Sequence, residues 1–426
     1  MSINTKPERW DFLSGVPLDL FKRANGKCSL PRCNNSTAAP AEVDSSAINM
    51  GKAAHIYSAS EDGPRGRGGK NEAFIRSAEN GLWCCAVHGD LIDKKGGKEF
   101  AAEKLFNWKK LVEARARKQV DQVPSPRGWV DVIELTLLPF AVSAKLQIKL
   151  SRFNLLHGPS NSGKSVLLEL AASITNSHNA RRMLSQSQGP RAASNLPTWS
   201  GKVLYTTVDV LDKVVQLDID AGHFRRREGS TPCLLPPGDI EVILCSSNDA
   251  EQRTDEDDVE FLMRLLNIDH STVHALLSLA VGKLLPGKYR IAQGYEDNEH
   301  GTDVQLRFKI NGKPHFELQF SDGNSWLPLS SLSKSSTDKV ILDLFIAKAR
   351  EVAKQRLTLF LVDGISFNFD EPNYQNLLNT IAAEEFQAVL CLPPRQEQFL
   401  LEKREGLLRL KDVAHLRSWD LIQLTR

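Results

Sequence analysis

Residues 153–165 read Phe-Asn-Leu-Leu-His-Gly-Pro-Ser-Asn-Ser-Gly-Lys-Ser. The first five predict a buried strand, and the mostly apolar residues 166–174 predict a helix. Glycines let backbone N–H groups close around phosphate oxygens, and a helix N-terminus adds about half a positive charge. Lys164 can then reach the β- and γ-phosphates, and the Ser165 hydroxyl can bind Mg²⁺. The pattern therefore predicts an α/β fold that binds a nucleoside triphosphate, which we take to be ATP. The expected contact residues in this loop are Gly158, Ser160, Asn161, Ser162, Gly163, Lys164 and Ser165.

The composition is that of an ordinary globular protein, with 426 residues, 41% apolar and 25% charged. This length allows two or three domains. No apolar run approaches about 18 residues, and residues 1–4 do not begin a signal peptide, so we expect a cytoplasmic protein without a membrane association. Residues 1–120 carry 20 Lys and Arg against 14 Asp and Glu, whereas the other 306 carry 34 against 38. The basic N-terminal third favours a polyanionic partner, although solubility alone explains such a charge equally well.

A Pro- and Gly-containing segment divides the chain. It follows a charged helical pattern at 106–119, and we predict a first domain over 1–120, a linker over 121–128 and a second domain over 129–426. In the second domain we expect a loop over 177–197, two helices within 258–284 that break near Asp269, and a hairpin around Asn311-Gly312. The predicted strands span 129–138, 144–150, 201–219, 239–245, 357–362 and 388–392, and further helices span 340–349 and 374–382.

Asp363 ends the apolar strand at 357–362, where an acidic residue is the expected water-mediated partner of the Mg²⁺ on Ser165. With the phosphate loop, this order of motifs resembles the ATPase heads of the ABC and SMC class over about residues 129–426. Residues 332–335, Leu-Ser-Lys-Ser, resemble a degenerate signature motif. In the family the signature serine, here Ser333, touches the γ-phosphate of a facing subunit. The resemblance thus implies a homodimer or higher homo-oligomer joined through ATP.

Two departures from that family concern hydrolysis. Lys334 and Ser335 stand where the signature usually has glycines, and Gly364 stands where active members carry a catalytic glutamate. Nothing obvious replaces that glutamate, although Glu371 is close in the sequence. We therefore expect ATP binding with little turnover, and we expect Gly364→Glu to raise hydrolysis.

The first domain contains two pairs of soft metal ligands. Cys28-x4-Cys33 and Cys85-x2-His88 suit one tetrahedral structural Zn²⁺, which could contribute on the order of 10 kcal/mol to the folding of a small domain. Cys84 competes with Cys85 for the ligand position, and the spacing favours Cys85. The predicted metal ligands are therefore Cys28, Cys33, Cys85 and His88.

Further motifs surround these pairs. They are Ala54-His55-Ile56, Gly63-Pro64-Arg65, Asn80-Gly81, Ile92-Asp93 and Trp108-Lys109. Over about residues 20–115 this assembly resembles the HNH endonuclease family, which implies a zinc-braced ββα-metal fold. Phosphodiester cleavage needs a base and a hard cation, Mg²⁺ or Mn²⁺. By this resemblance, His55 matches the base, and Asn80 matches the residue that positions it. We assign the carboxylate beside the catalytic cation to Asp93 and, as the weaker choice, Asp90.

The basic residues between these motifs have a more general role. We expect them to contact phosphates without sequence preference or to form a solvated face. They are Arg65, Arg67, Lys70, Arg76, Lys94, Lys95 and Lys98.

Three hypotheses follow. The first is an ATP-regulated HNH endonuclease that cleaves nucleic acid, with DNA preferred over RNA or tRNA. It resembles the Septu-type anti-phage systems, which implies a role in defence and leaves room for a separate defence subunit. The second is a non-catalytic zinc clamp on DNA that ATP dimerises. The third is a repair or mobile-element ATPase that nicks DNA.

Overall fold

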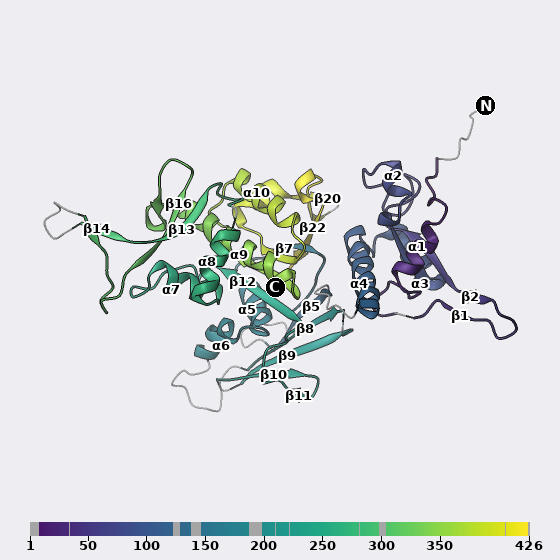
Figure 1. Cartoon of the computed structure of the whole chain (residues 1–426), viewed down its shortest axis with the longest axis horizontal. Helices are drawn as coiled ribbons and strands as arrows, with labels where there is room; N and C mark the ends of the chain where they lie inside the picture. Colours follow the sequence, from purple (N-terminus) through teal and green to yellow (C-terminus); the bar gives the residue numbers. More distant parts are fainter. Residues whose placement is uncertain are drawn as a thin grey trace.

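The computed structural model describes residues 8–33, 35–121, 128–137, 146–186, 198–208, 210–220, 222–280, 282–297, 304–404 and 406–424. Figure 1 shows a smaller body formed by the first part of the chain beside a larger body formed by the rest. We call them the N-terminal module (residues 8–121) and the head (residues 128–424). Of the linker predicted over 121–128, residues 122–127 lie outside the described residues.

The N-terminal module is built around one β-hairpin followed by a helix. Strand β3 (Gly51–His55) pairs antiparallel with β4 (Gly81–Cys85), so that His55 lies opposite Gly81, and α3 (Ala86–Leu91) begins directly after β4. A small apolar core lies beneath this hairpin and includes Ile56, Leu82 and Trp108. The other elements are α1 (Val16–Arg23), β1 (Ala38–Pro40), β2 (Ala47–Asn49), α2 (Glu72–Ile75) and α4 (Ala102–Asp121).

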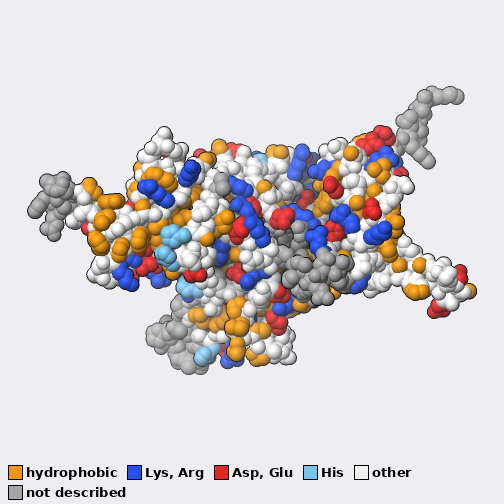
Figure 2. Space-filling view, viewed as in Figure 1, with side chains coloured by type: hydrophobic (Ala, Val, Ile, Leu, Met, Phe, Trp, Pro, Cys, Tyr) orange, Lys and Arg blue, Asp and Glu red, His pale blue; other side chains and the backbone are white. Residues whose placement is uncertain are grey.

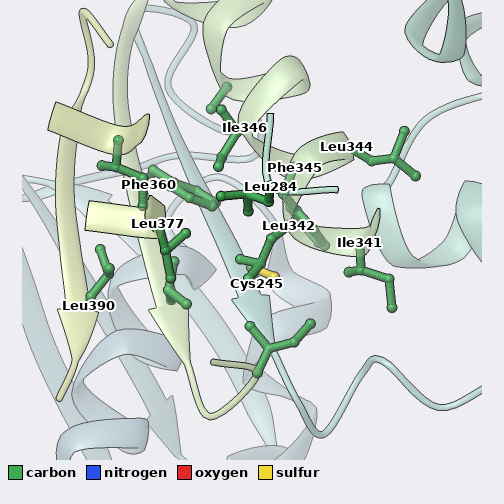
Figure 3. Packing of buried hydrophobic residues seen from close by; sticks show 14 of the residues in the cluster. Cys245, Leu284, Ile341, Leu342, Leu344, Phe345, Ile346, Phe360, Leu377 and Leu390 are labelled. Atoms are coloured by element: carbon green, nitrogen blue, oxygen red, sulfur yellow. The ribbon is translucent and has the colours of Figure 1, made fainter. Parts of the chain in front are cut away.

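The head contains a five-stranded parallel sheet in the order β12-β18-β19-β7-β22. Every residue of β18 and β19 is buried, as expected for strands covered on both faces. Figure 3 shows the packing on one side, where Phe345 and Leu342 of α9 and Leu377 of α10 meet Phe360 of β18. The bounds are β7 (Phe153–His157), β12 (Ile240–Ser246), β18 (Leu357–Asp363), β19 (Gln387–Cys391), β22 (Trp419–Gln423), α9 (Lys334–Ala353) and α10 (Glu371–Ala382).

A second, antiparallel sheet has the order β11-β10-β9-β8-β5-β6. Helix α5 (Lys164–Ser173) contacts β5 and β8 of this sheet as well as β12 and β18 of the parallel sheet. Its residues from Leu167 to Ser173 are all buried, so the helix is covered by both sheets. This double cover holds the N-terminus of α5 in a fixed place. The strands are β5 (Gly128–Leu137), β6 (Leu146–Lys149), β8 (Trp199–Thr207), β9 (Lys213–Asp220), β10 (His223–Glu228) and β11 (Thr231–Pro232).

An arm of paired strands projects from the head, and Figure 1 shows it beyond β13 and β16. Large apolar side chains are exposed along it, among them Tyr295, Val304, Phe308 and Ile310, and Figure 2 shows hydrophobic side chains gathered there. The strands are β13 (Lys288–Gln293), β14 (Tyr295–Asp297), β15 (Val304–Leu306), β16 (Phe316–Ser321) and β17 (Leu327–Pro328). The remaining elements are α6 (Arg181–Gln186), α7 (Asp258–Leu266), α8 (His270–Leu279), α11 (Glu397–Leu400), β20 (Leu401–Arg404) and β21 (Leu407–Leu410).

Most predicted strands and helices are confirmed, including the helix pair α7 and α8, where Asn267 ends the first helix and Asp269 caps the second. The loop predicted over 177–197 is wrong in its first half, because residues 177–186 are helical, with the Asn176 side chain capping the first turn; residues 187–197 lie outside the described residues. The hairpin predicted around Asn311-Gly312 forms but is short: Phe308 is bridged to Pro314, and the Lys309 N–H donates to the Lys313 carbonyl oxygen at 2.8 Å. Beyond it, β15 pairs with β14 and β16 pairs with β13.

Helix α4 joins the two bodies. Its residues Leu111 and Ala114 pack against Val208, and the Arg115 guanidinium donates to the Thr207 and Val208 carbonyl oxygens at 2.9 and 3.3 Å. No helix within the described ranges has both the length and the apolar composition that crossing a membrane requires.

Candidate functional site

The phosphate loop lies between β7 and α5. Asn161 and Gly163 have φ angles of +63° and +89°, so the chain turns sharply before the helix begins. A Cβ at Gly158 would approach the Leu424 carbonyl oxygen to 3.0 Å, which leaves little room for any side chain there. Lys164 Nζ donates to the Gly158 and Pro159 carbonyl oxygens at 2.6 and 2.9 Å. The loop therefore has the tight backbone that phosphate binding needs, with the lysine folded against it.

Asp363 approaches this loop from the end of β18. It is paired in register with Ser246 of β12 and is only 8% exposed. Asp363 and Lys164 both act on the buried Cys391 thiol: burial raises the pKa of Cys391, Asp363 raises it further, and Lys164 opposes this. These two charges therefore converge on the end of β19. The position of Asp363 beside α5 fits that of an indirect Mg²⁺ partner for Ser165.

Glu169 is a residue that the sequence reasoning did not single out. It lies one helical turn after Ser165 on α5 and is 8% exposed. Burial raises the pKa of Glu169 to about 7, Arg182 opposes this at 3.2 Å, and Asp363 adds to it. A second carboxyl group therefore lies within the electrostatic reach of Asp363. Only its i, i+4 spacing from Ser165 could have indicated it from the sequence.

The backbone at Gly364 does not easily accept a glutamate in place of glycine. Its φ angle is +83°, a conformation that side-chain-bearing residues rarely adopt, and a Cβ there would overlap Ser247 Oγ. A glutamate side chain would therefore strain this turn, which opposes the expected gain in hydrolysis from Gly364→Glu; that expectation stays a prediction.

Ser333 is the N-cap of α9. Its side chain is exposed at the helix end and accepts from the Ser336 backbone N–H at 3.3 Å. An exposed serine at a helix N-terminus is suited to donating to a phosphate group. The predicted contact between Ser333 and a γ-phosphate involves the nucleotide of a second copy of the chain.

The four predicted metal ligands lie together. The ligand atoms of Cys28, Cys33, Cys85 and His88 are all within 4.8 Å of one another. His88 Nδ1 lies 3.6 Å from Cys28 Sγ and 3.3 Å from Cys85 Sγ. Around a tetrahedral zinc with Zn–S bonds of about 2.3 Å, ligand atoms lie roughly 3.5–3.8 Å apart. The donor types and their spacing therefore fit a structural Zn²⁺.

Local structure explains this convergence. Cys85 is the N-cap of α3 and His88 lies in the first turn of that helix, so both side chains leave from one place. Cys84 is fully buried and hydrogen-bonds Cys28, which lowers the pKa of the Cys28 thiol and favours the thiolate that zinc binds. The structure thus includes Cys85 among the four ligands, whereas Cys84 only hydrogen-bonds one of them, Cys28.

His55 ends β3 beneath a short N-terminal segment that we call the strap (residues 8–13). The Phe12 ring stacks on the His55 ring, with centroids 3.6 Å apart and planes inclined by 4°. His55 Nε2 is buried and has no hydrogen-bond partner among the described residues. Burial lowers the pKa of His55 to about 4, although Asp11 opposes this shift. This shift favours the neutral form of His55, and Phe12 covers one face of its half-buried ring.

The strap is held by several contacts. The Trp10 ring lies 3.4 Å from the Arg67 guanidinium carbon, and the backbone N–H of Trp10 donates to the Ala59 carbonyl oxygen at 2.9 Å. Arg76 Nε donates to the Asp11 carbonyl oxygen at 3.1 Å. The expectation that Arg67 is mainly a phosphate contact or a solvated side chain is corrected, because its side chain is only 14% exposed and supports the strap.

Asn80 is fully buried and supports the backbone after His55. Its Oδ1 accepts from the Tyr57 N–H at 2.8 Å, and its Nδ2 donates to the Tyr57 and Ile75 carbonyl oxygens. The amide group thus fixes the loop that leaves β3. Its contacts are with backbone rather than with the imidazole.

Asp93 and Asp90 are both paired with cations. Asp93 accepts from Arg65 at 2.7 Å, and Asp90 pairs with Lys52. The Arg65 side chain is 7% exposed and also donates to the His55, Ile56 and Ile92 carbonyl oxygens, so it is a structural residue rather than a free phosphate contact. Through Arg65, Asp93 is connected to the backbone of His55, but its carboxylate does not touch the imidazole.

Comparisons with known proteins find only distant similarity. No protein-family model matches the chain, and no curated protein matches it. Among solved structures, the SMC head bound to the C-terminal winged-helix domain of ScpA is 13% identical, with 67% of this chain and 98% of that chain covered and a TM-score of 0.41. The ATP complex of the recombination mediator RecF is 12% identical, with 68% and 100% covered and a TM-score of 0.41. The SMC head domain from Thermotoga maritima is 14% identical, with 67% and 99% covered and a TM-score of 0.36.

Proposed function

We propose that this chain is an ATP-regulated, metal-dependent endonuclease in which the N-terminal module cuts nucleic acid, preferably DNA, and the head binds ATP. The observation that carries the proposal is the β3–β4–α3 unit with a Cys₃His group at one end and His55 at the end of β3. This unit stands on the same chain as a complete phosphate loop. The resemblance to anti-phage systems makes defence the proposed biological role.

In the proposed reaction, His55 accepts a proton from the attacking water through Nε2. Its low pKa keeps the ring neutral at pH 7 and therefore able to accept that proton. Asp93 would hold part of the shell of Mg²⁺ or Mn²⁺, and such a cation would supply positive charge beside the phosphate. Both steps require movement: Phe12 leaves the imidazole, and Asp93 exchanges Arg65 for the cation.

In the head, Lys164 and Ser165 bind the nucleotide and its Mg²⁺, and Ser333 completes the site of a second copy. ATP then acts mainly as a ligand that dimerises heads, because Gly364 provides no catalytic carboxylate. Two N-terminal modules brought together in this way favour paired nicks.

A second candidate function is a zinc clamp on DNA without catalysis. It is favoured by the cover of Phe12 over His55 and by the pairing of Asp93 with Arg65. In this alternative the basic module binds phosphates, and ATP controls only the association of heads.

A cleavage assay separates the two candidates. Wild type, His55→Ala and Lys164→Ala are incubated with labelled DNA and Mg²⁺ or Mn²⁺, with and without ATP. The nuclease proposal predicts that His55→Ala loses about 10²–10⁴-fold in rate, with DNA binding retained. It also predicts that Lys164→Ala removes the response to ATP. Equal cleavage by wild type and His55→Ala would leave the clamp as the better account.

A further inference from the structure

A cleft of about 900 Å³ lies between the N-terminal module and the head. One wall is formed by α4 and its neighbours, and the other by the end of α9, the start of β18 and the segment after α10. Its lining includes eight Lys and Arg residues but only four Glu residues. Because the whole chain has a net charge of only +2, this cleft concentrates positive charge.

Three cations of the lining, Arg23, Lys109 and Arg350, are engaged in structural ion pairs, and we call them the floor cations. Glu113 binds Arg23 and Lys109, both at 2.8 Å, and the pairs with these cations lower the pKa of Glu113 against the effect of burial. On the opposite wall Glu384 binds Arg350 at 2.6 Å and is 5% exposed. These floor pairs fix the shape of the cleft, and we do not assign them to a ligand.

Four further cations of the lining, Lys110, Arg117, Lys354 and Arg356, are what we call the rim cations. Lys110 is 3.9 Å from Glu385, and Arg356 is 3.5 Å from Glu241. Lys354 pairs with Glu351, but its side chain is 63% exposed. Arg117 is exposed and forms no ion pair within the part of the chain that the structure describes. Exposed ion pairs of this kind are worth at most about 1 kcal/mol, so a phosphate group can replace the carboxylates.

Two aromatic rings lie in the same lining. Phe74 and Phe106 are partly exposed, and their ring centroids are 6.5 Å apart. Grooves that bind single strands combine cations along the backbone with aromatic rings on which bases stack. A base-paired duplex keeps its bases stacked inside, where such rings cannot reach them.

One residue of the cleft lining contacts the strand pair that carries His55. Lys109, in the lining, donates to the Ala78 and Gly81 carbonyl oxygens at 2.8 and 2.7 Å. Gly81 lies opposite His55 in the β3–β4 pair. Lys109 thus connects the cleft to the β3–β4 pair, although neither Gly81 nor His55 lines the cleft itself.

We propose that this interdomain cleft binds a single-stranded segment of nucleic acid, with phosphates on the rim cations Lys110, Arg117, Lys354 and Arg356 and bases against Phe74 and Phe106. The purpose of this binding rests on the proposed nuclease function, whereas the binding itself requires no catalysis. Because the two walls belong to different bodies, the strand contacts the N-terminal module and the head together.

Binding is measured by fluorescence anisotropy on the full chain carrying His55→Ala, with a labelled single strand and a duplex of the same length. Two double variants remove the rim of one wall each, Lys110→Ala/Arg117→Ala and Lys354→Ala/Arg356→Ala. The matched control is Lys403→Ala/Arg409→Ala on the β20–β21 hairpin, where both side chains are exposed and outside the cleft. A further variant, Phe74→Leu, removes a ring but keeps an apolar side chain.

We expect each wall variant to weaken single-strand binding about tenfold or more and to lower the slope of log K against log salt by about 1.4, or 0.7 per lost contact. Phe74→Leu should weaken binding about fivefold or more. The control should bind like the parent, and the duplex should bind more weakly than the single strand. Inorganic phosphate at matched ionic strength should not displace the strand.

Normal binding by both wall variants would overturn the inference, and so would tighter binding of the duplex or full displacement by inorganic phosphate, which would indicate a small-anion site. The two proposals fail separately. If cleavage depends on His55 but the wall variants bind normally, only the proposal for the cleft is refuted. If binding depends on both walls but the protein never cleaves, only the nuclease proposal is refuted.

Discussion

The phosphate loop of the head and the His55 ring of the N-terminal module differ in access. The loop residues Ser160 and Asn161 are exposed, and the two sheets around α5 hold the loop from behind. His55 is covered by Phe12, on a strap with no regular secondary structure. The first site is open to a ligand, and only Lys164 must leave the Gly158 and Pro159 carbonyl oxygens to reach a phosphate. The second site needs the displacement of Phe12 before a substrate can reach it. Access to His55 is therefore expected to be controlled at the strap, whereas the loop provides the proposed control by ATP.

The largest expected effect is the loss of structure in the N-terminal module alone. Removal of zinc with a chelator, or Cys85→Ser, should unfold the N-terminal module while the head continues to bind ATP, because structural zinc contributes on the order of 10 kcal/mol. Elemental analysis should find one zinc per chain, and limited proteolysis should cut only the module. Cys233→Ser is the control, since Cys233 lies far along the chain in the head, on the β10–β11 side. Protein purified without chelator that contains no zinc would contradict this prediction.

The next effect concerns the loop alone. Lys164→Ala should weaken ATP binding by about a hundredfold or more, because a charge-assisted contact to phosphate is lost. Zinc content and the environment of His55 should remain unchanged. Isothermal titration measures the affinity, with Lys403→Ala as the control. Wild type should turn over ATP more slowly than about 1 s⁻¹, and a faster rate would show that another residue, with Glu169 the first to test, supplies the missing carboxylate.

A smaller effect tests the turn after Asp363. Gly364→Ala should destabilise the head by about 1–3 kcal/mol, because the positive φ and the overlap with Ser247 both oppose a side chain. Gly406→Ala is the matched control, since Gly406 has φ +77° but open space around its Cβ position. Chemical denaturation gives both values. Equal losses in the two variants would mean that the Ser247 contact has no effect.

The last expected effect concerns the pH dependence of stability. Because the folded pKa of His55 is about 4, below its ordinary value of 6.5, the unfolded chain binds the extra proton first as pH falls. The contribution of His55 to the free energy of unfolding is present above pH 6.5 and is lost between 6.5 and about 4. His55→Gln should flatten that interval, and Phe12→Ala should raise the pKa of His55 in an NMR titration. An unchanged pKa in Phe12→Ala would contradict the burial argument.

Sequence reasoning predicted the sites that depend on nearby residues. The loop at 158–165 is contiguous, and its strand and helix follow directly, so its geometry is local. Cys85 and His88 lie within one helical turn, and their spacing alone indicates that they bind the same metal ion. The end of β18 at Asp363 followed from a continuous apolar run.

The surroundings of His55 could not be predicted in the same way. Phe12 is 43 positions away, and its segment has no periodicity that would indicate a contact. Arg65 belongs to a recognised motif, but its burial against three carbonyl groups depends on how the loop after β3 folds. Glu169 and the overlap at Gly364 likewise depend on packing between elements that are distant in the sequence.

The most direct test of the central claim is the cleavage rate of Phe12→Ala, His55→Ala and the double variant on single-stranded DNA with Mg²⁺ or Mn²⁺ and ATP. If His55 is the base and Phe12 covers it, Phe12→Ala should cleave faster than wild type. The double variant should be as slow as His55→Ala. Cleavage by the double variant at the rate of Phe12→Ala would contradict the account, because the reaction would then proceed without His55.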